Sequence, residues 1–451
     1  MKKEFFLIAM AVAVFATACN PADEWALARK IERQIYEPEF LAADYRVTDY
    51  GAVPDGRTDA LPAILQAMTD CSRNGGGRVV LPAGKYFCKG TVRMMSNCNL
   101  HFEDGAELIF STDEKDYLPC VLTRWEGTEV FNYSPMIYAY NVMNIAITGK
   151  GVINGQGKAN FETWKASQKP DQREIRRMGV EQLPVYQRVF GEGHLLRPAM
   201  LELFACNTIL IEDVKLVDGT FWSFHLIGCS NAVVRGISVD CTNLNSDGVD
   251  PESSRNVIIE GCHFHTGDDG IAVKSGRDQD GWRLAQPTEN VIIRDCVFDT
   301  FANGLCIGSE ISGGVRNVFV ENCRIVNAKQ GIYFKSNLDR GGYIENVYVR
   351  NIDVENVDAA LVKFEPDYKS ESQRHYPTAI RDIVIENVKA ATAGTCGIYA
   401  KGFADMPIEN ILIRNLSLGS TGRAYDIENV RELRLENVSI NGEKTNAVLN
   451  E

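Results

Sequence analysis

Basic residues are scarce in this sequence. Its 451 residues include 47 lysines and arginines against 60 aspartates and glutamates, which leaves a formal net charge of −13 at pH 7. Nucleic acids and anionic membranes bind basic surfaces, so this charge excludes both as general partners. A polyanionic ligand would therefore have to meet a local basic patch.

Long apolar runs and low-complexity tracts are missing as well. The N-terminal apolar run, from Phe5 to Val14, is too short to span a membrane. No Pro- or Ser-rich tract indicates a long disordered linker, and 45% hydrophobic residues suffice for a large core. The length leaves open two or three average domains or a single long repeat domain.

The first residues carry an export signal. Two lysines precede the apolar run, and small residues lie just before Cys19, which predicts a signal peptide over residues 1–18. The end of this segment resembles a bacterial lipoprotein signal, although Ala16 stands where leucine is usual. The resemblance implies lipidation at Cys19, a membrane contact through the lipid anchor, and a periplasmic or cell-surface location in a Gram-negative bacterium. The alternative is an ordinary cleaved signal with an incidental cysteine.

A recurring phrase organises the C-terminal half of the chain. It begins at Asn231, Asn256, Asn290, Asn317, Asn346, Asp382 and Asn410, and the steps are 25, 34, 27, 29, 36 and 28 residues. Each copy is apolar and β-branched and is too short for a βαβ crossover. Constant phrases with irregular steps indicate stacked rungs joined by variable loops, so the pattern predicts an all-β, single-stranded parallel β-helix.

The cysteines fit this repeat rather than a disulfide framework. Cys262, Cys296 and Cys323 each lie six residues after the start of their phrase, where other copies have isoleucine, valine or leucine. Cysteine at such a position behaves as a small buried hydrophobe. We therefore expect these three residues to form part of a core ladder without disulfides, although the predicted export would permit them to pair.

Two further segments frame the repeat. The stretch from Leu61 to Cys71 is helical in pattern and predicts an N-terminal cap helix that covers the open end of the coil. Residues 158–197 are polar and lack the phrase, which indicates a long insertion beside a cleft. Residues 24–44 also have a helical pattern, to which no function is assigned.

Four successive repeats share a glycine, in the segments NSDGVDPESS, GDDGIAVKSG, NGLCIGSE and QGIYFKSN. Aligned on it, one column holds Asp247, Asp269, Asn303 and Gln330. A second column holds Lys274 and Lys335, which lie two repeats apart. Asp268 directly precedes Asp269 in the sequence. Stacked strands lie about 5 Å apart, so the fold would gather these carboxylates and amines on one face.

Three clustered carboxylates suit acid/base hydrolysis. One can be kept protonated by the charge of its neighbours while another stays ionised to activate water. Separations of about 6.5 to 9.5 Å, typical of inverting glycosidases, are within reach because the side chains splay outward. A lone Asp-Gly pair is more typical of a turn, but an aligned trio that includes Asp-Asp favours a site.

The segment NSDGVDPESSRNVIIEGCHFHTGDDGIAVKSG resembles the core signature of the polygalacturonase family, glycoside hydrolase family 28. The resemblance extends from about Tyr45 to Asn437. It implies a right-handed, pectin-lyase-like β-helix over residues 45–451, preceded by a lipidated tether and a short helical segment over residues 19–44. It further implies that Asp268 is the general acid and that Asp247 and Asp269 hold and deprotonate the attacking water. The resemblance implies inversion, with no metal or other cofactor.

Two positions depart from the family pattern. Asn303 and Tyr333 stand where histidine and arginine are usual, while Lys335 is kept. A phenol that can stack on a sugar and donate one hydrogen bond thus replaces a guanidinium fork. We therefore expect cleavage of α-galacturonosyl linkages in rhamnogalacturonan or decorated pectin rather than in plain homogalacturonan.

The remaining candidates for substrate contact lie around this signature. They are Lys274, Trp222, His225 and Glu310, with Arg277, Arg283 and Arg340 as candidates for the basic patch. Lys274 could instead offset the aspartates, and Trp222 and His225 could be packed structural residues. Asp250 could shape the turn before Pro251. No protein partner is inferred.

Two other functions remain open from the sequence. A polysaccharide lyase on the same fold would need a group that neutralises the uronate, usually calcium, and a Lys or Arg base. A non-catalytic carbohydrate-binding β-helix would explain the missing histidine and arginine. The insertion at 158–197 could wall off the cleft and favour attack from a chain end, as in an exo-acting galacturonidase.

Overall fold

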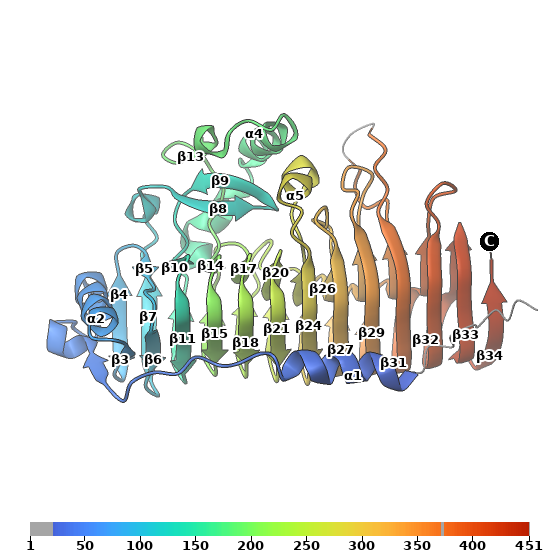
Figure 1. Ribbon diagram of the computed structural model, residues 1–451, viewed down its shortest axis with the longest axis horizontal. Helices are drawn as coiled ribbons and strands as arrows, with labels where there is room; N and C mark the ends of the chain where they lie inside the picture. Colours follow the sequence, from blue (N-terminus) through green and yellow to red (C-terminus); the bar gives the residue numbers. More distant parts are fainter. Residues whose placement is uncertain (1–20, 371–373, 451) are drawn as a thin grey trace, which may run out of the picture.

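The chain folds into an elongated coil of parallel strands (Figure 1). The computed structural model describes residues 21–370 and 374–450. The predicted signal peptide and Cys19, the predicted lipidation site, lie outside the described residues. Within the described part of the chain, no helix has the length and apolar character needed to cross a bilayer.

Three ladders of parallel strands form the coil. The first contains β1 (Asp44–Arg46), β3 (Gly77–Leu81), β6 (Cys98–Phe102), β11 (Met143–Gly149), β15 (Asn207–Glu212), β18 (Ser230–Arg235), β21 (Arg255–Glu260) and β24 (Thr288–Arg294). It continues through the long strands β27 (Val315–Ala328), β29 (Tyr343–Val357), β31 (Ala379–Lys401), β32 (Ile408–Glu428) and β33 (Val430–Ile440).

The second ladder contains β2 (Asp55–Asp59), β4 (Gly84–Cys88), β7 (Ala106–Phe110), β12 (Val152–Asn154), β16 (Lys215–Val217), β19 (Ser238–Cys241), β22 (His263–Thr266) and β25 (Val297–Thr300), and it continues in the long strands. The third contains β5 (Val92–Arg93), β10 (Ile137–Tyr140), β14 (Leu201–Phe204), β17 (Phe224–Ile227), β20 (Val249–Glu252), β23 (Ile271–Val273), β26 (Asn303–Ile307), β28 (Gln330–Lys335) and β30 (Ala360–Glu365). β34 (Glu443–Leu449) pairs antiparallel with β33 and ends the coil.

The first residue of each phrase lies near the start of its strand in the first ladder. All seven starting residues, from Asn231 to Asn410, have φ between 53° and 59°, in the left-handed region that asparagine and aspartate tolerate better than other side chains. Asn290 also donates to the amide oxygen of Asn256 at 3.0 Å and accepts from Asn317 at 3.0 Å. The repeated asparagine is thus explained by backbone conformation together with a ladder of side-chain hydrogen bonds.

Substitution of Asn290 tests this explanation. Asn290→Ala is expected to lower the free energy of unfolding by about 2 kcal/mol, because it removes two amide hydrogen bonds and leaves a Cβ at positive φ. Asn290→Gly loses the same hydrogen bonds but fits the backbone, so the loss should be smaller. Urea denaturation of both variants measures the difference, and a glycine variant less stable than the alanine variant would contradict the explanation.

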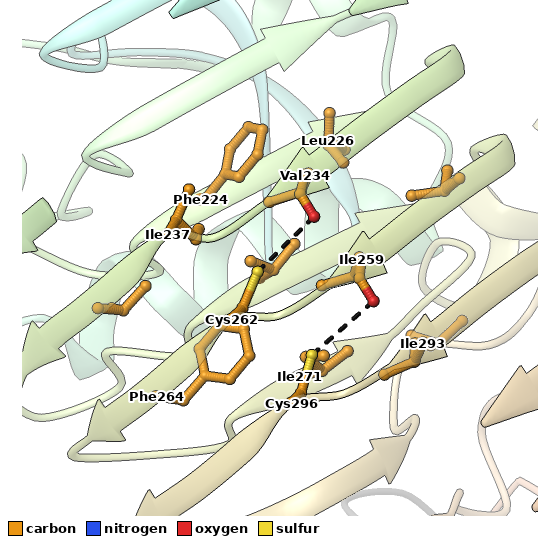
Figure 2. Packing of buried hydrophobic residues seen from close by; sticks show 14 of the residues in the cluster. Phe224, Leu226, Val234, Ile237, Ile259, Cys262, Phe264, Ile271, Ile293 and Cys296 are labelled. Carbon is orange, nitrogen blue, oxygen red and sulfur yellow. Dashed lines mark hydrogen bonds between the residues drawn. The ribbon is translucent and has the colours of Figure 1, made fainter. Parts of the chain in front are cut away.

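The core ladder of cysteines is confirmed. Cys262, Cys296 and Cys323 are buried free thiols, and Cys323 pairs in register with Ile352 of the next rung. The Sγ atoms of Cys262 and Cys296 lie 3.6 and 3.8 Å from backbone carbonyl oxygens of the preceding rung (Figure 2). These thiols pack as small hydrophobes with weak hydrogen bonds rather than as disulfides.

Helices cover the coil at its end and along one side. The predicted cap helix is α2 (Leu61–Arg73), which buries Ile64, Ala67 and Met68 against the first rungs. α1 (Pro21–Glu32) lies along the outside of the first ladder (Figure 1), where Trp25 and Ile31 pack on Ile258, Ile292 and Phe319. The guanidinium of Arg350 lies 3.5 Å from the Trp25 ring centroid.

The loops above the third ladder form a second layer (Figure 1). A three-stranded sheet contains β8 (Val121–Trp125), β9 (Thr128–Asn132) and β13 (Val189–Phe190). β9 contacts α4 (Lys169–Val180), within the predicted insertion, and α5 (Asp278–Leu284). α3 (Phe161–Trp164), also within the insertion, packs on Tyr117 and Tyr133. Short 3-10 turns are η1 (Val47–Tyr50), η2 (Glu114–Tyr117), η3 (Gly157–Ala159) and η4 (Val185–Gln187).

Candidate active site

The third ladder aligns the acidic residues as predicted. Val249 of β20 pairs with Ile271 of β23, which pairs with Leu305 of β26, while Asn303 pairs with Gln330. This register places Asp247, Asp269, Asn303 and Gln330 in one column. The pairing of Val273, Ile307 and Phe334 places Lys274 and Lys335 in another, two rungs apart.

The shared glycine beside each aspartate has a steric cause. A Cβ added at Gly248 would lie 2.3 Å from the carbonyl oxygen of Gly270, and a Cβ at Gly270 would lie 2.9 Å from that of Gly304. Successive rungs therefore approach too closely here for any larger residue. The tight stacking holds the aspartates immediately before β20 and β23 in a fixed position.

Asp269 is a buried carboxylate held in its charged form. Lys335 Nζ lies 2.7 Å from one of its oxygens, and Asn303 donates its side-chain amide to the other. Burial acts to raise the pKa of Asp269, but the charges of Lys335 and Lys274 outweigh it and leave the pKa below the ordinary value. Asp269 can therefore accept a proton.

The pKa of Asp268 is shifted in the opposite direction. Its burial, together with the neighbouring charge of Asp269, raises the pKa of Asp268 above the ordinary value. Asn245 donates to it at 3.1 Å, and Lys165 of the insertion donates to the same asparagine at 2.6 Å. Two adjacent carboxyls thus have pKa values shifted in opposite directions, which is the arrangement expected of an acid and a base.

Asp247 shares its buried surroundings with Asp250. Lys274 Nζ lies 3.3 Å from Asp247 and 3.6 Å from Asp250. Burial raises the pKa of both, that of Asp250 to about 7, and the charge of Asp250 adds to the rise at Asp247. In the described structure neither oxygen of Asp250 has a hydrogen-bond partner, so this residue faces the ammonium of Lys274 rather than shaping a turn.

Lys274 and Trp222 contact each other in the site. Lys274 Nζ lies 4.4 Å from the Trp222 ring centroid, and Glu310 lies 3.7 Å from the same ammonium. The opposing carboxylates raise the pKa of Lys274, although burial alone would lower it. Lys274 therefore stays charged and offsets Asp247 and Asp250. This is one of the two roles that the sequence left open for it.

His225 lies below the site in a buried ion network. Its Nε2 is 2.8 Å from Glu252 and its Nδ1 is 3.6 Å from Glu202. Burial lowers the pKa of His225, but the two glutamates outweigh it and raise the pKa to about 9. Arg124 of β8 lies 3.0 Å from Glu252, so the network also fixes the β8–β9 hairpin on the third ladder.

One pocket of about 300 Å³ collects most of the predicted residues. Those that line it are Asp247, Asp268, Asp269, Lys274, Lys335, Trp222, Glu310, Arg277 and Arg340. Asn303, His225 and Tyr333 do not line it: Asn303 and His225 bond to acidic groups, and Tyr333 is 4% exposed and donates to Glu365. Arg283 is exposed and pairs with Glu129.

The pocket also contains residues that the sequence did not single out. They are Glu126, Lys165, Gln172, Arg176, Asn245, Ser309, Asn337, Tyr368 and Lys369. Most come from the β8–β9 hairpin, the insertion and the loop after β30. Seven cationic side chains and five carboxylates line the pocket in the described part of the chain. The pocket therefore supplies the local basic patch that a protein with a net charge of −13 needs to bind an anionic ligand.

Comparison with protein families and relatives gives a consistent assignment. Residues 189–442 match the model of Glycosyl hydrolases family 28, and residues 45–103 match one described as Rhamnogalacturonase A/epimerase, pectate lyase-like. A probable polygalacturonase of Vitis vinifera is 29% identical over 389 residues, 81% of this chain and 73% of the relative. An endo-polygalacturonase of Pectobacterium carotovorum subsp. carotovorum is 24% identical over 413 residues, 88% of this chain and 94% of the relative.

Solved structures share the architecture. A hyperthermoactive exopolygalacturonase from Thermotoga maritima is 34% identical, with a TM-score of 0.89 over 94% of this chain and 100% of that chain. The polygalacturonase from Erwinia carotovora ssp. carotovora, 22% identical with a TM-score of 0.68 over 89% of this chain and 98% of that chain, has the same fold. The predicted right-handed parallel β-helix is confirmed. The chain belongs to glycoside hydrolase family 28 and is a hydrolase of galacturonan.

Proposed function

We propose that the protein releases galacturonate from the ends of plain homogalacturonan chains, with inversion at the anomeric carbon. The observation that carries this proposal is the small size of the pocket beside the three aspartates. Its volume of about 300 Å³ lies at the small end of the range for ligand sites. Such a space suits the terminal sugar of a chain better than the middle of a long polymer.

The walls of the pocket support action at chain ends. Glu126, at the tip of the β8–β9 hairpin, accepts hydrogen bonds from Gln172 at 3.0 Å and from Arg176 at 2.5 Å, both in α4. Arg188 of the insertion forms a fully buried ion pair with Asp280 of α5 at 2.5 Å. Hairpin, insertion and α5 are thus tied together beside the aspartates.

The proposed chemistry follows from the pKa directions of the two adjacent aspartates. Asp268 donates its proton to the glycosidic oxygen as the bond to the anomeric carbon breaks. Water attacks that carbon from the opposite face and passes a proton to Asp269, while Asp247 holds the water. Asp268 regains a proton and Asp269 loses one to solvent before the next cycle.

The expected preference for rhamnogalacturonan or decorated pectin has no support beyond the substitution at Tyr333. The pocket contains guanidinium groups from other positions, Arg176 and Arg277. A planar guanidinium that can bind the carboxylate of a uronate is therefore still present, although the arginine usual at position 333 is missing. The similar proteins from Vitis vinifera and Thermotoga maritima are named as polygalacturonases. We therefore propose homogalacturonan as the substrate.

Product analysis at early times tests this proposal. Polygalacturonate should give galacturonate as the first product while the viscosity falls slowly, and rhamnogalacturonan oligosaccharides should react more slowly. A series of mixed oligomers in the first minutes would contradict end-on attack. Faster release from rhamnogalacturonan would overturn the substrate assignment.

The alternatives from the sequence receive less support. The family match favours hydrolysis over β-elimination, and three aspartates around one pocket favour catalysis over binding alone. Export and lipidation at Cys19 remain a proposal that rests on the sequence of the first residues. Labelling of the wild type, but not of Cys19→Ala, with a radioactive fatty acid would support it.

A further inference from the structure

Selection of galacturonate over galactose requires a partner for the sugar carboxylate. Two positions were compared with the family pattern above, and the side chains at both already have hydrogen-bond partners within the protein. Lys335 is bonded to Asp269 at 2.7 Å, and Tyr333 donates to Glu365 with its ring buried. Lys335 holds the proposed catalytic base and Tyr333 does not line the pocket, so we consider the guanidinium groups of the pocket, which are also paired but present several N–H groups each.

Guanidinium groups gather where the hairpin, α4 and the segment before α5 meet. Arg277 Nη1 lies 3.2 Å from Glu310 Oε1 and 3.8 Å from Glu126 Oε2. Arg176 Nη2 lies 2.5 Å from that same oxygen of Glu126. A single carboxylate oxygen is thus already within reach of both arginines, which shows that their spacing suits a carboxylate.

Positive charge is crowded at this point. Burial, together with the charges of Arg340 and Arg176, lowers the pKa of Arg277 to about 10. Glu126 and Glu310 offset part of this charge, but the pocket as a whole keeps more cationic than acidic side chains. An additional carboxylate is therefore favoured here over a neutral group of the same size.

We propose that Arg176 and Arg277 bind the carboxylate of the terminal galacturonate and thereby select uronate over neutral galactose. This inference rests on the proposed exo-action. A guanidinium presents several N–H groups in a planar fork that matches a carboxylate, whereas lysine acts as a point charge. Because Arg176 belongs to the insertion, the segment that walls the pocket also supplies its selectivity.

The hairpin tip is shaped to fit Arg277. The backbone N–H of Arg277 donates to the carbonyl oxygen of Gly127 at 3.0 Å. A Cβ at Gly127 would lie 2.9 Å from both the backbone nitrogen and the Cβ of Arg277, and φ at this glycine is 82°. The glycine lets the hairpin lie directly on Arg277, so the position of this arginine is fixed before substrate arrives.

The test compares two trisaccharides that differ only at the non-reducing end, trigalacturonate and its analogue with galactose in place of the terminal galacturonate. Wild type should prefer trigalacturonate by about 100-fold in kcat/KM. Arg176→Gln should lose about 10- to 100-fold on trigalacturonate, since removal of a charged hydrogen bond costs about 1.5 to 3 kcal/mol, and less than about 3-fold on the analogue. The kcat/KM of Arg176→Lys on trigalacturonate should lie between those of the wild type and of Arg176→Gln.

Arg173→Gln is the matched control, because Arg173 lies on the same helix, is exposed and does not line the pocket. It should leave both substrates unchanged. Equal losses on both substrates in Arg176→Gln would show a structural role and overturn the proposal, as would an unchanged preference. If wild type instead released galacturonate from the reducing end of trigalacturonate, or did not cleave it at all, the proposed attack at the non-reducing chain end would itself fail.

Discussion

Asp268→Asn is expected to reduce kcat on polygalacturonate by about 10²- to 10⁴-fold, the usual contribution of a general acid. The reason is that the amide cannot donate a proton to the departing oxygen, although it has almost the same shape as the carboxylic acid. Asn245 can still bond to it, so KM should change little. Initial rates of reducing-sugar release over a range of substrate concentrations measure both constants.

The control for this variant is Asp353→Asn on β29. Asp353 is exposed, lies outside the pocket and belongs to the same coil, so the same chemical change there should leave kcat unaltered. Thermal denaturation checks that both variants fold. If Asp268→Asn kept more than about a tenth of the wild-type kcat, Asp268 would not be the general acid.

Lys335→Met is expected to lower the free energy of unfolding by about 3 to 5 kcal/mol at neutral pH. The ammonium of Lys335 and the carboxylate of Asp269 are both buried and lie 2.7 Å apart. Removal of one partner leaves the other charge buried without its closest counter-ion. Turnover should fall as well, because Asp269 is then less able to stay ionised.

The loss of stability should depend on pH in a defined direction. In the wild type the folded pKa of Asp269 is depressed, so its contribution to stability is present above the unfolded value of 3.8 and is lost as pH falls through the folded pKa. Without Lys335, burial dominates and the pKa rises. The stability difference between wild type and variant should therefore be large at pH 7, begin to shrink as pH falls through the raised pKa of Asp269 in the variant, and shrink further below pH 3.8.

A double variant provides the control for the buried pair. Lys335→Met with Asp269→Asn removes both charges, so the protein should regain most of the stability lost in the single variant while remaining inactive. Urea denaturation at pH 7 and pH 4 measures all three proteins. A single variant as stable as the double variant at pH 7 would show that the pair does not stabilise the fold.

The repeat explains why so much of the site was predictable. Strands that stack in register fix the relative positions of residues far apart in the chain, so alignment on one glycine placed Asp247 and Asp269 in one column and Lys274 and Lys335 in another. The pairing of β20, β23, β26 and β28 confirms both columns. The same logic identified Cys296 as a core residue rather than half of a disulfide.

Residues outside the repeat could not be placed in the same way. Arg176 lies in an insertion that was expected beside the cleft, but nothing in its sequence tells which helix face meets the pocket. Glu126 lies at a hairpin tip with φ of 44°, where no repeat sets a register. Tyr333 was expected to face the sugar, yet its hydroxyl donates a hydrogen bond to Glu365 of the next rung and lies outside the pocket.

The anomeric configuration of the first product tests the central claim most directly. Proton NMR of polygalacturonate hydrolysis, followed from the first minutes before mutarotation, should show β-galacturonate appearing ahead of the α form. That order follows if Asp268 protonates an α-linked oxygen while Asp269 deprotonates water on the opposite face. Initial release of α-galacturonate would require a covalent intermediate and would contradict the account.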